Sequence, residues 1–120
     1  MRRPERVAEL LREEISEIVG FELDDPRVFS VTVTEVKVAG DLRDAKVFVL
    51  VDGDEKEINT ALEALRHATP YIRRQVGTAL AMRHTPALHF VRDTVEEKGA
   101  RVDQLLVGIQ RESFERKDEE

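Results

Sequence analysis

Residues 58–80, INTALEALRHATPYIRRQVGTAL, decide the fold. Apolar residues recur at helical spacing on both sides of Pro70, which indicates two helical segments. Proline has no N–H and its ring clashes with the carbonyl four residues earlier, so a straight helix is kinked or ends at this position. The residue before a proline is also pushed out of helical geometry. We therefore expect two helices joined by a kink at Ala68, Thr69 and Pro70, with Thr69 as the N-cap of the second helix.

The sequence around this kink is rich in arginine and lacks acidic residues. Residues 64–92 contain five arginines, all three histidines and no Asp or Glu, whereas the whole chain has a formal net charge of -6. This block is therefore +5, which leaves -11 for the remaining residues. A basic face and a helix start beside an arginine pair both favour contacts with phosphate. The predicted phosphate contacts to an RNA are Arg66, Arg73, Arg74 and Arg83, with Lys46, Arg2, Arg3 and Arg6 as secondary contacts.

The length and composition of the chain restrict its class. A chain of 120 residues forms one domain with a sizeable core. Cysteine is absent, which excludes a disulfide framework, a thiolate nucleophile and a zinc–sulfur site. No apolar run approaches the length of a membrane span, and the first residues, MRRPERVAEL, contain no apolar signal region. We expect a cytoplasmic protein.

The first half of the chain predicts a helix followed by a hairpin. Residues 3–19 place apolar side chains on one helical face and glutamates on the other, and Gly20 is a suitable C-terminal stop. Two strands are expected at residues 28–38 and 45–51, close enough in sequence to pair as an antiparallel hairpin. The alternation of apolar residues changes phase within the first strand, so we expect a β-bulge near residues 34–35.

The second half completes a small sheet. A third strand is expected at residues 86–92, and a capping box at Thr94 begins a last helix with an apolar stripe of Val102, Leu105, Leu106 and Ile109. Residues 111–120 are polar and are expected to form a disordered tail after a domain of residues 1–110. The predicted fold class is α+β: helix, strand, strand, helix–kink–helix, strand and helix, with the helices packed on one face of a three-stranded sheet.

No catalytic constellation is recognisable. None of the serines (Ser16, Ser30 and Ser113) lies in a glycine elbow, and the sequence contains neither a phosphate-binding loop nor a dinucleotide fingerprint. The histidines are unevenly spaced and have no acid nearby, which argues against a metal site. We therefore expect no enzymatic activity, no metal and no cofactor. Aromatic residues are few and only Tyr71 lies at the kink, which favours recognition of RNA backbone and shape over base stacking.

Five short motifs in a fixed order and spacing carry a family resemblance. They are Arg3-Pro4-x-Arg6-Val7, Asp25-Pro26-Arg27, Asp41-Leu42-x-x-Ala45-Lys46-Val47, Ala68-x-x-x-Ile72-Arg73 and Pro86-x-Leu88-x-Phe90-x-x-Asp93. With these motifs the chain resembles the ribosome-binding factor A family over roughly residues 3–109. The family carries Ala-x-Gly at the kink in place of the usual Gly-x-x-Gly loop of KH domains, and here that site is Ala68-Thr69-Pro70, with proline at the glycine position.

The resemblance implies both a fold and a function. It implies a type II KH-like domain with the order of elements given above. It also implies binding of the immature small ribosomal subunit (30S) and assistance in maturing its 16S ribosomal RNA, notably near the ends of the RNA and in the cold. The implied partners are the 30S subunit and its RNA. From the sequence itself we expect no membrane and no small-molecule substrate as partners, and we expect a monomer.

A second class of function stays open at this point. The chain is also compatible with a protein-interaction or dimerisation module that uses an exposed strand edge or the acidic first helix. Such a module would self-associate in sedimentation experiments, whereas the RNA-binding hypothesis predicts a monomer. A small hydrolase would need a pocket with paired titratable groups, and the sequence shows no such pair.

Overall fold

The computed structural model describes residues 3–94. Along the chain it contains helix α1 (Arg3–Glu17), a π-helical turn (Ile18–Glu22), a 3-10 turn (Pro26–Val28), strands β1 (Val31–Val38) and β2 (Asp44–Val51), helix α2 (Glu55–Ala79) and strand β3 (Ala87–Arg92). The expected last helix, the polar tail and Arg2 lie outside the described residues. No helix among residues 3–94 is long and apolar enough to cross a membrane.

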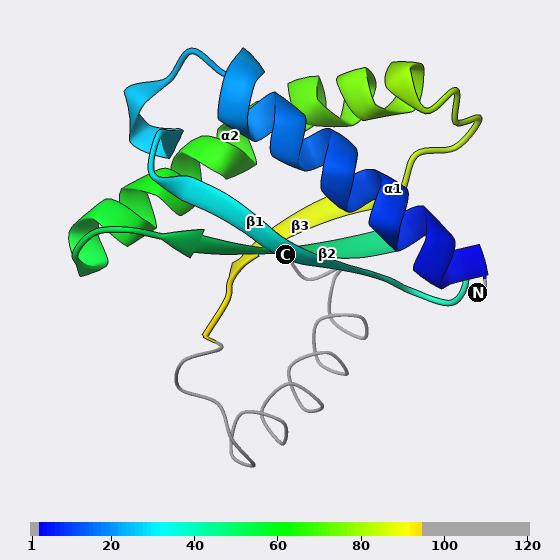
Figure 1. Cartoon of the computed structure of the whole chain (residues 1–120), viewed down its shortest axis with the longest axis horizontal. Coiled ribbons are helices and arrows are strands. Elements are labelled where there is room, and N and C mark those ends of the chain that lie inside the picture. The colour runs from blue at the N-terminus through cyan, green and yellow to red at the C-terminus, as the bar shows by residue number, and fades with distance from the viewer. Residues whose placement is uncertain (1–2, 95–120) are drawn as a thin grey trace.

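The three strands form one sheet in the order β1-β2-β3, with β2 in the centre. β1 and β2 pair in antiparallel fashion, as expected for a hairpin, and β3 pairs with β2 in parallel. A parallel partner requires a crossover connection, and α2 provides it. Figure 1 shows α1 and α2 on the same face of the sheet, which confirms the predicted α+β arrangement.

The predicted β-bulge is present in β1. The register with β2 shifts between Val33 and Glu35, which leaves Thr34 as the extra residue. The side chain of Thr34 is anchored there, because its Oγ1 lies 3.2 Å from the carbonyl oxygen of Phe48 and 2.5 Å from Oδ2 of Asp93. The bulge corrects the phase of the strand, so that the valines on both sides of it face the helices.

The helix N-terminus of α2 has a complete capping box. Oδ1 of Asp54 accepts from the N–H of Glu57 at 2.8 Å, and Oε1 of Glu57 accepts from the N–H of Asp54 at 2.9 Å. The buried residues of α2 recur at helical spacing and cover the sheet; they are Ile58, Ala61, Leu62, Ala64, Leu65, Ile72 and Val76. These residues share one core with α1 and with the inner face of all three strands.

The expected pair of separate helices is wrong, because α2 continues through Pro70 as a single helix of 25 residues. Thr69 is not an N-cap; its Oγ1 donates to the carbonyl of Leu65 at 2.8 Å, a bond made inside a helix. Leu65 and Ile72, on either side of the proline, are both 0% exposed, so both halves are held against the same core. Figure 1 shows that the two halves run in different directions, as expected for a helix kinked by an internal proline.

Two element boundaries differ from the sequence expectation. Gly20 does not end the first helix; the chain widens there into a π-helical turn that ends where the N–H of Leu23 donates to the carbonyl of Ile18 at 3.0 Å. This wider turn allows the consecutive residues Ile18 and Val19 both to be buried. The first strand begins at Val31, because Asp25 caps a 3-10 turn immediately before it.

Replacing a buried leucine of α2 should destabilise the protein far more than replacing an exposed leucine of α1. Leu65 is 0% exposed and Leu10 is 38% exposed. Leu65→Ala leaves a cavity at the contact between α2 and the sheet, so we expect it to lower the free energy of unfolding by about 2–5 kcal/mol. Leu10→Ala should cost less than about 1 kcal/mol. Urea denaturation of both variants measures the difference, and equal losses would contradict the burial of α2.

Candidate nucleic-acid interface

Five arginines gather around a groove at one end of the molecule. The groove consists of two adjoining hollows of 590 and 780 Å³, which share Arg73, Met82, Arg83, His84 and Thr85 as lining residues. It lies where the end of α2, the loop of residues 80–86, the start of α1 and the turn between β1 and β2 meet. We call it the arginine groove; its charged and histidine residues are Arg3, Asp41, Arg43, Arg73, Arg74, Arg83 and His84.

The end of α2 is built to turn the chain back sharply into the groove. Ala81 has a positive φ of 52°, the left-handed conformation that ends many helices. The N–H of Met82 donates to the carbonyl of Gly77 at 2.9 Å, and that of Ala81 to the carbonyl of Thr78 at 3.2 Å. These two bonds form a Schellman motif, which satisfies the last carbonyls of the helix and directs the chain back along α2.

Gly77 and Arg73 hold the returning loop against α2. A Cβ atom on Gly77 would lie only 2.6 Å from Oγ1 of Thr85, so the close approach of loop and helix requires glycine. Arg73 donates from Nε to the carbonyls of Thr85 and Pro86 at 3.2 and 3.1 Å, and from Nη2 to Thr85 at 2.5 Å. Arg73 therefore positions the loop while its exposed side chain still lines the groove.

The other groove cations are available for an anionic ligand. Arg74 and Arg83 are exposed, and neither makes a side-chain hydrogen bond or ion pair with the described part of the chain. Asp41 is the one acidic residue among the described groove residues, and its Oδ1 accepts from the N–H of Arg43 at 3.0 Å. Because the described groove residues include five arginines and one acidic residue, the groove has a positive potential although the protein is acidic overall.

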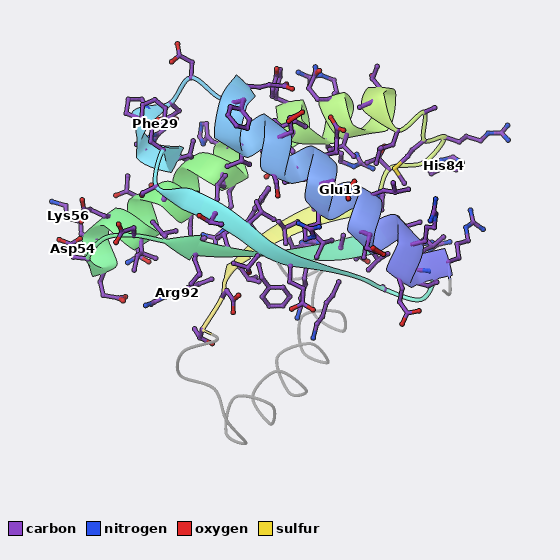
Figure 2. The ribbon with its side chains drawn as sticks, viewed as in Figure 1. Glu13, Phe29, Asp54, Lys56, His84 and Arg92 are labelled. Atoms are coloured by element: carbon purple, nitrogen blue, oxygen red, sulfur yellow. The ribbon has the colours of Figure 1, made fainter. Side chains whose placement is uncertain are left out.

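The structure brings together some of the predicted contacts and separates others. The groove is lined by Arg73, Arg74 and Arg83 of the predicted main contacts and by Arg3 of the secondary ones. Arg66 and Arg6 are exposed but do not line it. His84 lies at the opposite end of the molecule from Asp54, Lys56 and Arg92 (Figure 2). The arginine groove is therefore at one end and the start of α2 at the other.

Lys46 lies away from the groove. It is 2% exposed on β2, the central strand. Burial lowers the pKa of its ammonium group, and the neighbouring charge of Lys37 lowers it further. This placement does not favour a phosphate contact, and we define the interface without Lys46.

The sequence analysis missed Arg43 as a member of the cluster. Arg43 lies in the turn between β1 and β2, outside the arginine-rich block of residues 64–92. The parallel pairing of β3 with β2 places it there, because the N–H of Ala87 donates to the carbonyl of Arg43 at 2.9 Å. No local signal reports such a long-range contact. The described residues also contain no group of three or more His, Asp or Glu side chains able to hold a metal ion.

One expected source of phosphate binding is not present. A helix start at Pro70 would have offered free N–H groups beside Arg73 and Arg74. Because α2 is continuous through this position, those N–H groups lie within the helix. The backbone N–H groups beside Arg73 and Arg74 are therefore not available to an anion.

The fold and the site together define a class: an α+β domain of the KH-like kind, with a cationic groove at one end. The comparisons with known proteins narrow this class to a family. The model of ribosome-binding factor A matches residues 3–106. The ribosome-binding factor A of Solibacter usitatus is 50% identical over 105 residues, which cover 88% of this chain and 85% of that protein. That of Desulfitobacterium hafniense is 45% identical over 117 residues, covering 98% and 92%. The chain belongs to the ribosome-binding factor A family.

Solved structures agree with this assignment. The crystal structure of ribosome-binding factor A from Thermus thermophilus has a TM-score of 0.67 and 26% identity to this chain, covering 76% of this chain and 97% of that one. A homology model of the T. thermophilus factor, fitted into the cryo-EM map of a 30S complex of that factor, has a TM-score of 0.63 and 27% identity, with coverages of 75% and 94%. The type II KH-like fold implied by the motifs is confirmed.

Replacing Gly77 by alanine should destabilise the contact between α2 and the returning loop, and replacing Thr85 by alanine as well should cancel this loss of stability. In a helix interior alanine is favoured over glycine by about 1 kcal/mol. Here the new Cβ would meet Oγ1 of Thr85 at 2.6 Å, so we expect Gly77→Ala to destabilise the protein by about 1–2 kcal/mol. In a Thr85→Ala background the clash is removed, and the same change should become neutral or stabilising. A double-mutant cycle by thermal denaturation measures this coupling, and additive effects would contradict it.

The lowered pKa of Lys46 predicts a pH dependence of stability. The folded protein releases the Lys46 proton at lower pH than the unfolded chain, whose lysine has a pKa near its ordinary value of 10.5. Between the two pKa values the unfolded state binds more protons, so this group's contribution to stability rises with pH. We expect the unaltered protein to gain stability relative to Lys46→Met as the pH is raised toward 10.5, the ordinary pKa of lysine.

Urea denaturation across this pH range makes the measurement. Lys56→Met is the matched control, because it replaces an exposed lysine of α2. The prediction would be refuted if Lys46→Met and the unaltered protein changed stability in parallel.

Proposed function

We propose that this protein binds the small ribosomal subunit through the arginine groove and assists the late maturation of that subunit. The observation that carries the proposal is the cluster of five arginines around one groove of a KH-like domain, with Asp41 as the one acidic residue that lines it within residues 3–94. The fitted 30S complex of the related Thermus thermophilus factor supports the choice of partner. The ligand within the subunit is its 16S ribosomal RNA.

The chemistry of the groove suits the RNA backbone. Arginine presents a planar fork of donors that matches phosphate oxygens, and each contact releases counterions from the RNA. Such contacts fix position and orientation without reading bases. The guanidinium donors come from Arg43, Arg74 and Arg83, and Arg73 keeps the loop that carries Arg83 in place. The groove thus recognises the shape formed by several phosphates.

The protein acts in this proposal as a binding factor and not as a catalyst. It works as a monomer in the cytoplasm, where subunits mature, and it needs no cofactor. Its task is to hold ribosomal RNA in a conformation that allows processing of the 16S precursor. Since RNA misfolds more persistently at low temperature, this task matters most in the cold. The family resemblance supports these finer points, and the groove supplies the physical means.

Removing two groove arginines should weaken binding to the 30S subunit. We expect the double variant Arg74→Ala/Arg83→Ala to bind about 10- to 100-fold more weakly, because each arginine contributes charge-assisted hydrogen bonds to phosphate. The slope of log K against log salt concentration should fall by roughly one to two. Co-sedimentation of purified protein with isolated 30S subunits, at several salt concentrations, measures both quantities.

The matched control is Lys56→Ala/Arg92→Ala. It removes the same number of positive charges from the opposite end of the molecule (Figure 2). It should leave affinity and salt slope nearly unchanged. Equal effects of the two double variants would show that binding depends on net charge alone and would refute the site. No binding of the unaltered protein to any subunit would refute the function, and self-association would favour an interaction module.

A further inference from the structure

Two phenylalanines point away from the core on the connection between α1 and β1. Phe21 and Phe29 are 85% and 67% exposed, whereas Phe90 of β3 is 2% exposed. A single exposed apolar side chain is common on protein surfaces, but apolar surface gathered in one place marks a site of interaction. Here two large rings lie within nine residues of sequence. Figure 2 shows Phe29 on the opposite side of the molecule from His84 of the arginine groove.

The chain that carries the two rings is fixed to the core. Val28, immediately before Phe29, is 1% exposed, and Leu23 packs against the core. The N–H of Phe29 donates to the carbonyl of Pro26 at 3.2 Å, and that of Leu23 donates to the carbonyl of Ile18 at 3.0 Å. Both rings are therefore carried on closed turns that hold them toward the solvent.

An ion pair fixes the turn before the second ring. Nη2 of Arg27 lies 2.7 Å from Oδ2 of Asp25, and the N–H of Arg27 donates to Oδ1 of the same carboxylate at 3.0 Å. A surface that is ordered before binding loses little conformational entropy when a partner arrives. The two rings are thus presented in advance of any contact.

The surroundings of the rings are strongly acidic. Residues 13–30 contain six acidic residues and one arginine, a net charge of -5, and residues 52–63 contain five acidic residues and one lysine, a net charge of -4. The two stretches meet, because α2 packs against the turn of Pro26–Val28 and the charge of Glu63 acts on Arg27. Such a surface repels RNA phosphate and attracts a basic partner.

We propose that residues 21–29 dock a basic protein segment that carries apolar side chains. The apolar side chains of the partner cover Phe21 and Phe29, and its lysines or arginines face the acidic residues around them. Aromatic side chains are enriched in the buried centres of protein interfaces, and charged residues lie at the rims. The arrangement of rings and acids matches this anatomy.

The source of the partner is a protein of the small ribosomal subunit. This choice rests on the proposed function, whereas the chemistry of the docking surface does not. Proteins that lie on ribosomal RNA carry basic surfaces, since they neutralise its phosphates. With the arginine groove on RNA, the aromatic end contacts a protein of the same particle. The first contact gives the second a high effective concentration, so the two together bind more tightly than either alone.

Removing both rings should weaken binding to isolated 30S subunits without changing its salt dependence. We expect Phe21→Ser/Phe29→Ser to bind at least about tenfold more weakly, because apolar contact is lost. The slope of log K against log salt concentration should stay the same because no charge changes, whereas the groove variant lowers it. Co-sedimentation measures both quantities, and circular dichroism checks that each variant folds. The control is Leu10→Ser, which removes a 38% exposed side chain of α1 and should bind normally.

A photoreactive side chain identifies what the surface touches. Phe29 is replaced by para-benzoylphenylalanine in the full chain, which is then irradiated on isolated 30S subunits. We expect a covalent adduct with a subunit protein, which protease destroys and ribonuclease leaves intact. The same photoreactive side chain in place of Leu10 should give little of this adduct.

Several outcomes would overturn the inference. Unchanged affinity of Phe21→Ser/Phe29→Ser, or an equal loss in Leu10→Ser, would show that the two rings make no particular contact. An adduct formed mainly with 16S ribosomal RNA would identify a nucleic acid as the occupant. An adduct between two copies of this chain would identify a surface for self-association.

Failure of the unaltered protein to bind the 30S subunit would refute the proposed function and with it the choice of source. The docking surface is then tested with a synthetic amphipathic peptide of leucine and lysine, by fluorescence anisotropy. The unaltered protein should bind this peptide at least about tenfold more tightly than Phe21→Ser/Phe29→Ser does, and a peptide of serine and lysine should not distinguish the two proteins. Equal affinities for the leucine peptide would refute the docking surface.

Discussion

β3 pairs with β2 in parallel, with Ala87 opposite Asp44 and Arg92 opposite Val49, and the rest of the structure depends on this pairing. A parallel neighbour cannot follow from a short turn, so the chain must travel the length of the sheet before it returns. Helix α2 forms this crossover connection and covers one face of the sheet. Its end and the loop that follows are thereby brought to the turn between β1 and β2, where the arginine groove forms.

The sequence predicted the local features of this arrangement well. The hairpin, the bulge at Thr34 and the third strand follow from alternation of apolar residues, a property that each strand shows on its own. The two ends of α2 and its core face follow from helical spacing in the same way. The fold class could therefore be predicted before the spatial neighbours were known, and the family motifs added the type of α+β fold.

What the sequence could not predict depends on contacts between distant residues. The separate helices expected at Pro70 are one helix, because Leu65 and Ile72 bury against a common core and outweigh the missing N–H of one proline. Arg43 joins Arg83 only through strand pairing, and the sequence gives no sign that Lys46, a charged residue, is only 2% exposed.

In the proposed function, the separation of charge along the molecule allows an acidic protein to approach RNA. The groove end carries Arg74 and Arg83, while the start of α2 at the other end carries acidic residues such as Asp54 (Figure 2). The acidic end is repelled by phosphate while the basic end is attracted, so the protein is oriented during encounter. A uniform basic surface would bind in many orientations, whereas the proposed role requires a single one.

Pro70 removes one backbone hydrogen-bond donor from the groove. The resemblance implies a glycine at this place, and a glycine would have kept a backbone N–H that proline lacks. Here Pro70 lines the groove, has no N–H, and lies inside an unbroken helix. The backbone of Pro70 offers no hydrogen-bond donor to a phosphate, so the phosphate contacts proposed here come from arginine side chains. In the proposed interface these long side chains adapt to several phosphate arrangements, while the loop held by Arg73 fixes where their charge is presented.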